Sequence, residues 1–195
     1  MNQANKLAGD GYLTGCSSLD EFRQLAESLG KVTLESDIRI SVHKAFASGA
    51  DAVPPHGDGP DARYIALYCV QQQVPPIPIT LINARSALKD LSPKCIRFLQ
   101  KSRFRRGGQE FHILTVYKDS FCLYYAPWLV NDRKIVEQET FQEFVRFVSR
   151  MIREKSFETL WTPGEFVIFD NYRFLHARQT LVLDSPRHLV RLWLN

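Results

Sequence analysis

The pattern of hydrophobic and polar positions predicts a chain built mainly of strands. Phe166–Phe169 is a continuous apolar run that follows the turn signal Thr162-Pro163-Gly164. Leu189–Leu194 is a second apolar run, broken only by Arg191, and Tyr64–Val70 is a third. Short apolar runs of this kind, bounded by turn residues, are typical of buried strands.

Helix signals occur between these runs. Ser18 and Glu21 have the spacing of a capping box, apolar residues follow at helical spacing, and Gly30 is a stop signal. Ser92-Pro93 combines a capping residue with a proline in the first turn. We therefore expect helices over Leu19–Leu29, Asn83–Leu91 and Pro93–Lys101, and another that Thr140-Phe141-Gln142-Glu143 caps and begins.

The remaining segments complete the predicted order of elements. Alternating residues favour strands over Val32–Leu34 and Ile38–Phe46, and a hairpin of Phe111–Val116 and Ser120–Tyr125 across Lys118-Asp119. The Gly- and Pro-rich segment Ala47–Ala62 is expected to be a loop. We expect a flexible N-terminal arm over residues 1–17 and a single domain over residues 18–195.

Composition is that of an ordinary globular protein. The chain has 195 residues, of which 45% are apolar and 24% charged, enough for one domain with a sizeable core. A net charge of +4 is mild, and Lys101–Arg106 is the only dense basic run. We interpret that run as a solvated loop or helix end, because nucleic-acid binding requires a stronger basic stripe.

Cysteine usage and hydropathy bear on the compartment. Four cysteines are scattered without a Cys-x-x-Cys pair, which favours buried thiols in a reducing compartment over disulfides or a zinc knuckle. We find no signal peptide and no apolar run of membrane-spanning length. The expectation is a soluble cytoplasmic protein that does not contact membranes.

An unusual number of polar residues lies between the last two apolar runs. Burying an unpaired charge is costly, so a strand-rich core accumulates charges only where a ligand or metal compensates them. The residues concerned are Asp170, Asn171, Arg173, His176, Arg178 and Arg187.

Two of the arginines are spaced to act together. Arg187 and Arg191 fall on the same face of an extended strand, with Leu189 between them. Guanidinium groups bind carboxylates through two parallel hydrogen bonds, so an anionic small molecule is a natural ligand. The alternative is that both are surface or edge charges, and His176 taken alone is more often a hydrogen-bonded core histidine.

His56-Gly57-Asp58 supplies a second cluster of potential ligands. An imidazole and a carboxylate two residues apart on an extended chain project to the same side, where they can bind one ion. Together with the distant His176 they form the set of two histidines and one carboxylate that holds iron(II). A His-x-Asp by itself is weak evidence, because Asp-Gly is common in turns.

Four segments together resemble the taurine dioxygenase and clavaminate synthase-like branch of the iron(II), 2-oxoglutarate-dependent oxygenases. They are HGDGPDARYIALYCVQQ, ITLINARSALKDL, PGEFVIFDNYRFLHARQTL and PRHLVRLWL, and they occur in the family's order. The resemblance implies a mainly β fold with flanking helices, a double-stranded β-helix (jelly roll, cupin-like barrel). It also implies that His56, Asp58 and His176 hold iron at the mouth of that fold.

The resemblance further implies a site for the cosubstrate. Arg187 follows His176 by eleven residues, a spacing the family uses for the arginine that binds the far carboxylate of 2-oxoglutarate. Arg191, four residues later, would support the cosubstrate or meet an acidic group of the substrate. Thr80 matches a threonine whose hydroxyl contacts the same carboxylate, although Pro78-Ile79 stand where relatives usually have a glycine pair.

The implied reaction uses iron(II), 2-oxoglutarate and O2. The family splits 2-oxoglutarate into succinate and carbon dioxide and oxidises an unactivated C–H bond, with hydroxylation, desaturation and ring closure as open outcomes. We expect a small acidic or amino-acid-like substrate in a biosynthetic pathway. Residues that could contact it are Tyr124, Tyr125, Trp128 and Arg178, although the aromatic residues could equally be core.

Other classes of protein stay open at this point. A metal-free relative would only bind a small ligand or a protein partner, and a cupin-like isomerase or dioxygenase would work without 2-oxoglutarate. The chain is also shorter than most relatives, which suggests a trimmed cover over the substrate. Either the site is more open, or a partner or a second copy in a homo-oligomer supplies the cover.

Overall fold

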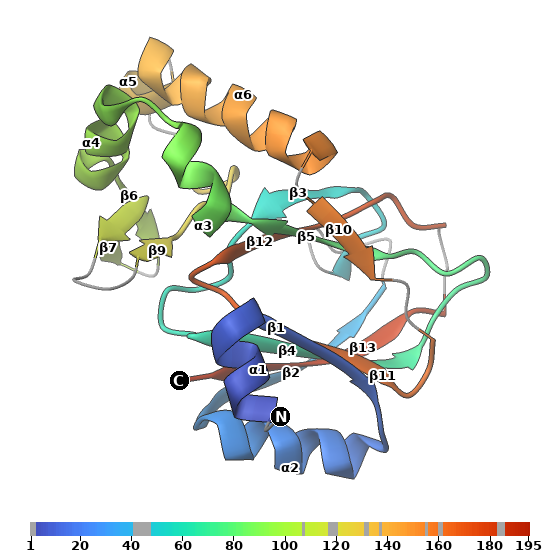
Figure 1. Ribbon diagram of the computed structural model, residues 1–195. Coiled ribbons are helices and arrows are strands. Elements are labelled where there is room, and N and C mark those ends of the chain that lie inside the picture. The colour runs from blue at the N-terminus through green and yellow to red at the C-terminus, as the bar shows by residue number, and fades with distance from the viewer. Residues whose placement is uncertain are drawn as a thin grey trace.

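Two antiparallel sheets face each other in the computed structural model (Figure 1). The structure describes residues 3–40, 48–106, 108–116, 121–130, 133–136, 138–154, 156–159, 162–182 and 186–195. One sheet has the order β1 (Tyr12–Cys16), β11 (Glu165–Asp170), β4 (Tyr64–Gln71), β13 (His188–Leu194) and β2 (Val32–Arg39). The other has the order β10 (Ser156–Thr159), β5 (Ile79–Asn83), β12 (Phe174–Arg178) and β3 (Val53–His56). The mainly β prediction is confirmed, although the two sheets do not close into a continuous barrel.

The five-stranded sheet is apolar on both faces. Along β4, Ile65, Leu67 and Cys69 join the core between the two sheets, whereas Ala66 and Tyr68 join a second core on the outer face. Alternate residues of a strand point to opposite faces, so a strand covered on both sides reads as one continuous apolar run. The predicted strands over Tyr64–Val70, Phe166–Phe169 and Leu189–Leu194 are confirmed for this reason.

Helices cover the outer faces of both sheets. α1 (Gln3–Asp10) and α2 (Leu19–Leu29) lie under the five-stranded sheet, and α6 (Glu139–Glu154) runs above the four-stranded sheet (Figure 1). A third core joins α6 to the segment between β5 and β9. That segment contains α3 (Ala84–Ala87), the 3-10 turn η2 (Leu88–Asp90), α4 (Pro93–Lys101), β6 (Arg103–Arg106), β7 (Gln109–His112), β8 (Leu114–Val116) and β9 (Phe121–Leu123), and α5 (Arg133–Val136) follows.

Two of the three predicted helix caps are present. The capping box of Ser18 and Glu21 begins α2, and the Ser92 hydroxyl accepts a hydrogen bond from the Cys95 N–H at the start of α4. The third was wrong, because α6 begins at Glu139 and Thr140 is already inside it. Glu143 instead accepts hydrogen bonds from the N–H and hydroxyl of Ser92, so it ties α6 to α4.

The N-terminal residues differ from the expected flexible arm. Residues 3–10 form α1 and residues 12–16 form β1, and all of β1 pairs with residues 165–169 of β11. Leu7 and Leu13 are buried in the outer core of the five-stranded sheet. Without β1, β11 would be an open sheet edge, and pairing that edge stabilises an otherwise polar segment.

Two other segments were assigned to the wrong element. Residues 32–39 form one strand, because β2 pairs along β13 with one register shift between Trp193 and Leu194, while residues 41–46 of the expected second strand lie outside the described part of the chain. The expected loop Ala47–Ala62 contains β3, which pairs with β12. β3 has two prolines, and these obscured the strand because proline cannot donate to a ladder of hydrogen bonds.

The predicted hairpin was correct only where residues 114–116 pair with residues 121–123. β8 pairs with β9, and the expected turn Lys118-Asp119 lies outside the described residues. Gln109–His112 pairs instead with Arg103–Arg106. The basic run Lys101–Arg106 is therefore the end of α4 and strand β6, not a solvated loop. No helix among the described residues is both long and apolar enough to cross a membrane.

Candidate metal centre

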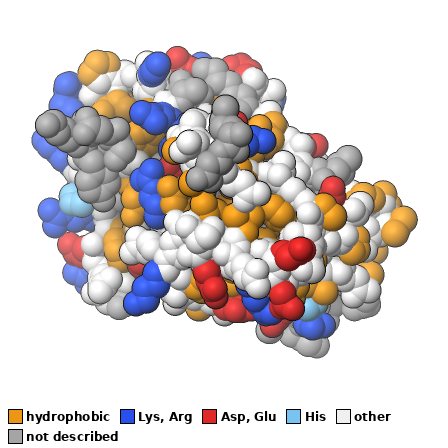
Figure 2. All heavy atoms as spheres, turned by 60° about the horizontal axis from the view of Figure 1, so that its bottom comes forward, with side chains coloured by type: hydrophobic (Ala, Val, Ile, Leu, Met, Phe, Trp, Pro, Cys, Tyr) orange, Lys and Arg blue, Asp and Glu red, His pale blue; other side chains and the backbone are white. Residues whose placement is uncertain are grey.

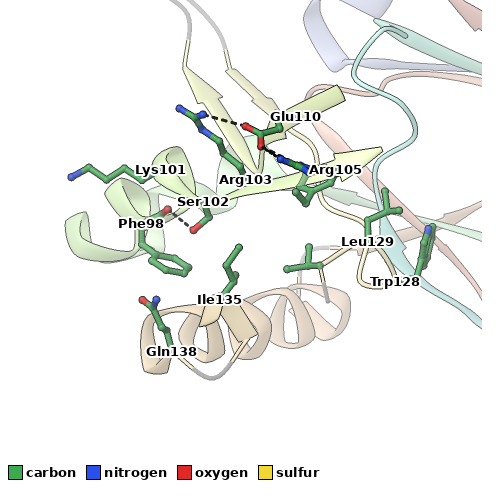
Figure 3. Close-up of a pocket in the computed structure, with 12 residues that line it drawn as sticks. Phe98, Lys101, Ser102, Arg103, Arg105, Glu110, Trp128, Leu129, Ile135 and Gln138 are labelled. Carbon is green, nitrogen blue, oxygen red and sulfur yellow. Dashed lines mark hydrogen bonds and ion pairs between the residues drawn. The ribbon is translucent and has the colours of Figure 1, made fainter. Parts of the chain in front are cut away.

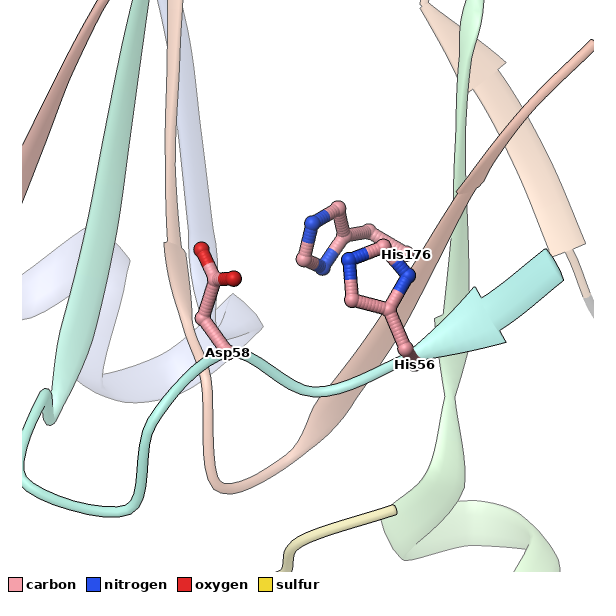
Figure 4. Close-up of side chains that lie close together, drawn as sticks. All are labelled: His56, Asp58 and His176. Carbon is pink, nitrogen blue, oxygen red and sulfur yellow. The ribbon is translucent and has the colours of Figure 1, made fainter. Parts of the chain in front are cut away.

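The pairing of β3 with β12 creates the centre of the site. His56 and His176 are direct partners across the two strands, and their ring centroids are 4.0 Å apart. Asp58 follows two residues after His56, in the loop that leaves β3. Figure 4 shows the three side chains pointing toward one another, and one ligand atom from each lies within 4.8 Å of the other two. Residues 56, 58 and 176 thus come together as the sequence predicted.

Each of the two imidazoles has a nitrogen atom that is available to a metal. Nδ1 of His56 lies 2.9 Å from the Pro54 carbonyl oxygen, which can only accept, so this nitrogen carries the proton. Nε2 of His56 is then the unprotonated donor that a metal requires. Nδ1 of His176 is buried and has no hydrogen-bond partner in the described part of the chain, a state that is costly unless a ligand satisfies it.

Asp58 is held as a carboxylate by a guanidinium. Its Oδ2 and Oδ1 accept hydrogen bonds of 3.2 and 3.4 Å from Nη1 of Arg191, whose Nε donates to the Ser36 hydroxyl. Burial raises the pKa of Asp58, but its electrostatic interactions with His176, Arg191 and His56 outweigh burial and lower the pKa below its usual value. The aspartate is therefore ionised at neutral pH.

Both histidines are neutral at neutral pH. Burial lowers the pKa of His176 to about 3, with a further contribution from the neighbouring His56, and burial also lowers the pKa of His56. Metal ligands must be deprotonated to bind, so no proton has to leave either ring at neutral pH. Two neutral imidazoles and one carboxylate on one side fit iron(II), and they leave the opposite side for exchangeable ligands.

Asn171 organises the loop that carries Asp58. Its Oδ1 accepts a hydrogen bond of 2.9 Å from the Asp58 N–H, and its Nδ2 donates to the carbonyl oxygens of Gly59 and Ala62. The residue is only 2% exposed. Gly57 fits the same arrangement, because a Cβ there would lie 3.2 Å from the Leu123 carbonyl oxygen.

We expect Asn171→Ala to destabilise the protein by about 2–4 kcal/mol, because it leaves several buried backbone groups without partners. It should also weaken iron binding about 10- to 100-fold, as loss of supporting contacts usually does. Urea unfolding and anaerobic iron titration measure the two effects. Gln179→Ala removes an exposed amide near the end of β12 and should change neither; equal effects of both variants would rule out this role for Asn171.

Arg187 lies in the same cavity as the two histidines. The cavity has a volume of about 50 Å³ and is lined by Ile38, Val53, His56, Leu67, Ile79, His176, Ala177, Arg178, Arg187 and Leu189. Arg187 is 4% exposed, and burial lowers its pKa to about 10, so it stays protonated at neutral pH. The volume is far below the roughly 300–1,000 Å³ of typical ligand pockets, so side chains must move before a dicarboxylate can enter.

Arg191 lies on the inner face of β13, and Arg187, which directly precedes this strand, lines the cavity between the sheets, so both face inward as predicted. Leu189 and Trp193 from this face enter the core between the sheets, whereas Leu192 and Leu194 enter the outer core. The sequence did not indicate that Arg191 pairs with Asp58. Its guanidinium therefore supports a potential metal ligand and is not directed at the Arg187 cavity.

The structure does not bring Thr80 to this cavity. Its neighbours Ile79 and Leu81 face the core between the sheets, so Thr80 faces the other side of β5, where its hydroxyl lies 3.5 Å from Glu158. Arg178 borders the cavity, but its guanidinium donates to the carbonyl oxygens of Gly49, Asp51 and Gln179. Arg178 thus anchors the segment that precedes β3.

The three aromatic residues have different positions. Tyr124 and Tyr125 are buried, and Tyr125 packs edge-on against Phe144 in the core under α6. Trp128 lies 4.8 Å from the His56 ring, centroid to centroid. It also lines a groove of about 890 Å³, drawn in Figure 3, whose other walls include α4, the β6–β7 hairpin and α5. Trp128 is therefore the predicted aromatic residue that contacts the centre.

Comparisons with known proteins agree with this geometry. The model of a family described as "Taurine catabolism dioxygenase TauD, TfdA family" matches residues 114–193. An asparagine oxygenase, solved with Fe(II), 2S,3S-3-hydroxyasparagine and succinate, is similar with a TM-score of 0.78 and 16% identity over 98% of this chain and 78% of its own. The search of curated proteins found no match.

Two other solved structures have the same fold. The non-heme iron oxygenase OrfP, in complex with Fe and alpha-ketoglutaric acid, has a TM-score of 0.72 and 14% identity over 98% of this chain and 78% of its own. PvcB from Pseudomonas aeruginosa has a TM-score of 0.70 and 16% identity over 98% of this chain and 80% of its own. At 14–16% identity, these likenesses show that the chain shares the jelly-roll fold of the three solved structures. The match to the TauD, TfdA family model covers less than half of the chain, so it shows a similarity of the C-terminal part to that family.

Proposed function

We propose that this protein is an iron(II)- and 2-oxoglutarate-dependent dioxygenase that oxidises a C–H bond of a small, amino-acid-like molecule. One observation carries the proposal: His56, Asp58 and His176 converge within 4.8 Å, and the protonated guanidinium of Arg187 lies in the cavity that both histidines line. A metal site beside a buried cation suits a cosubstrate that chelates iron at one end and carries a carboxylate at the other.

Each residue has a separate task in this function. His56, Asp58 and His176 would hold the iron, which supplies the activation of O2 when it is bound. The Pro54 carbonyl oxygen orients His56, and Arg191 keeps Asp58 ionised and in place. Arg187 would bind the far carboxylate of 2-oxoglutarate. The apolar residues around it exclude water and so strengthen that ion pair.

The substrate class is inferred from the structural neighbours. The structural neighbours were solved with hydroxyasparagine and with hydroxy-L-Arg, which are modified amino acids. We infer an amino-acid-like substrate here, with hydroxylation as the default reaction and desaturation or ring closure as alternatives. A biosynthetic role, a cytoplasmic location, and a cover supplied by a partner or second subunit all stay predictions.

Iron titration and succinate release test the proposal together. The purified protein is expected to bind one iron(II) per chain under anaerobic conditions, and to release succinate from 2-oxoglutarate in the presence of O2. Succinate without added substrate would come from slow uncoupled turnover. A protein that binds no iron would be a metal-free binding module, and one that binds iron but makes no succinate would favour a dioxygenase or isomerase that works without 2-oxoglutarate.

A further inference from the structure

The groove at Trp128 is much larger than the cavity beside Arg187. Its volume of about 890 Å³ lies within the range of roughly 300–1,000 Å³ that is typical of ligand pockets, whereas that cavity has only about 50 Å³. Trp128 lies at one end of the groove and Lys101 at the other (Figure 3). Because the Trp128 ring is 4.8 Å from the His56 ring, centroid to centroid, the groove leads from the surface to the candidate metal centre.

Apolar side chains form much of the wall of this groove. Phe98 of α4, Leu129 and Ile135 of α5 line it, and each of them is only half-buried. Apolar surface that is hollowed and has a polar rim marks a binding site for a ligand. A ligand that covers these side chains gains free energy in proportion to the apolar area that it removes from water. The groove therefore favours a ligand with an apolar body.

The rim of the groove carries a net positive charge among the residues that the structure describes. Lys101, Arg103 and Arg105 line it together with one carboxylate, that of Glu110. Both arginines pair with Glu110, at 3.3 and 3.1 Å, and Lys101 forms no ion pair with a described residue (Figure 3). Figure 2 shows Lys and Arg side chains mainly on the left, the side on which α4 and β6 lie in Figure 1, and this charge attracts anions.

The order of these features along the groove defines an orientation for the ligand. In Figure 3, Lys101 and Arg103 lie at the end remote from Trp128, and Leu129 and Ile135 lie between the two ends. A molecule with one charged end would be bound with that end at the cations and its apolar end beside the candidate metal centre. A short molecule cannot reach both ends, so the ligand must be elongated.

We propose that this groove selects the primary substrate, and that the substrate is an elongated amphipathic carboxylic acid. Its carboxylate binds at Lys101 and Arg103, and its apolar end reaches the candidate metal centre past Trp128. The inference rests on the oxygenase function proposed above, because it names the substrate class of that site. It restricts the amino-acid-like substrate to derivatives with a long apolar group, such as N-acyl amino acids.

Binding of N-acylglycines of increasing acyl length tests this assignment. Calorimetric titrations compare the acetyl, hexanoyl and decanoyl compounds below their micellar concentrations, on protein loaded anaerobically with iron(II) and 2-oxoglutarate, so that binding is measured without turnover. Affinity is expected to rise about two- to fourfold for each added methylene, because each one removes apolar area from water. N-decanoylglycine amide keeps the chain without the charge and should bind about three- to tenfold more weakly than the acid.

Variants of the lining residues locate the ligand in the groove. Leu129→Trp and Ile135→Trp each fill part of the groove, so either should weaken binding of N-decanoylglycine at least about tenfold and leave iron binding unchanged. Lys101→Gln should weaken binding of the acid about two- to fivefold and leave the amide unchanged. Lys94→Gln removes an exposed charge of α4 that does not line the groove, and it should change neither.

Manganese(II) in place of iron reports the orientation of the bound acid. Paramagnetic broadening of ligand NMR signals falls steeply with distance from the ion. The terminal methyl protons of N-decanoylglycine should therefore broaden more than the protons of its glycine methylene. The reverse order would place the carboxylate at the metal and would overturn the proposed orientation.

Three further results would overturn the assignment. They are absent binding of N-decanoylglycine or an affinity that does not change with acyl length, equal affinities for acid and amide, and undiminished binding of the long acid in both tryptophan variants. Iron and 2-oxoglutarate titrations of the same samples separate the two proposals. Normal binding of both with one of these results rejects only the role of the groove. A protein that binds the long acid but no iron rejects the oxygenase function, and with it the groove as a substrate site.

Discussion

Replacing His176 with alanine is expected to abolish iron binding and turnover together. The imidazole would supply one of the three proposed protein ligands, and its loss should weaken iron binding by more than about 100-fold, since even supporting contacts are worth about 10- to 100-fold. Succinate release should fall to the level without enzyme. The fold should survive, because the change removes a buried nitrogen that has no partner among the described residues. Iron content after anaerobic loading and desalting measures the effect.

Suitable controls separate loss of the ligand from loss of the fold. His112→Ala removes a histidine of β7 that lies outside the iron site, and this variant should keep both iron and turnover. His56→Ala should behave like His176→Ala. The effect of Asp58→Ala is harder to attribute to the metal alone, because this change also removes the salt bridge of Arg191. If His176→Ala still binds one iron per chain and releases succinate at the original rate, the proposed iron site is wrong.

Replacing Arg187 with alanine should weaken 2-oxoglutarate binding about 100-fold or more and leave iron binding intact. Its guanidinium is almost fully buried and protonated at neutral pH, so a carboxylate bound there would form an ion pair shielded from water. Removing one partner of such a buried pair costs roughly 2–5 kcal/mol. The effect should appear in the KM for 2-oxoglutarate, with kcat largely recovered at saturation.

Arg187→Lys and an exposed arginine provide the comparison. Lysine keeps the charge but cannot form the two parallel hydrogen bonds, so its KM should lie between those of the alanine variant and the unmodified protein. Arg39→Ala removes an exposed charge from β2 and should leave the KM unchanged. An unchanged KM in Arg187→Ala would mean that the far carboxylate binds elsewhere.

The sequence predicted the chemistry of the site better than its surroundings. His56, Asp58 and His176 were predicted as iron ligands because few residue types bind iron, and because His-x-Asp followed by a distant histidine matches a known ligand set; the structure brings the three side chains together. The four-residue spacing of Arg187 and Arg191 placed both on one face of an extended strand, but it left open whether that face is buried or exposed. These inferences need only residue type and local spacing, and both are properties of the sequence itself.

Thr80 shows where local spacing was insufficient. A shift of one residue in a strand moves a side chain to the opposite face, and the rebuilt turn at Pro78-Ile79 left the face of Thr80 undetermined by resemblance. The structure places Ile79 in the cavity and Thr80 beside Glu158. The N-terminal strand β1 was missed for a related reason, since its stability comes from pairing with β11 and not from its own composition.

The sequence alone thus determined the mainly β class, the covered strands and the three residues proposed to hold iron, because burial and metal chemistry act on residue type and period. Only the tertiary structure decided that β3 pairs with β12 so that His56 faces His176, and that Arg191 holds Asp58. Each of these contacts joins residues far apart in the chain. The register between strands sets them, and no local pattern encodes that register.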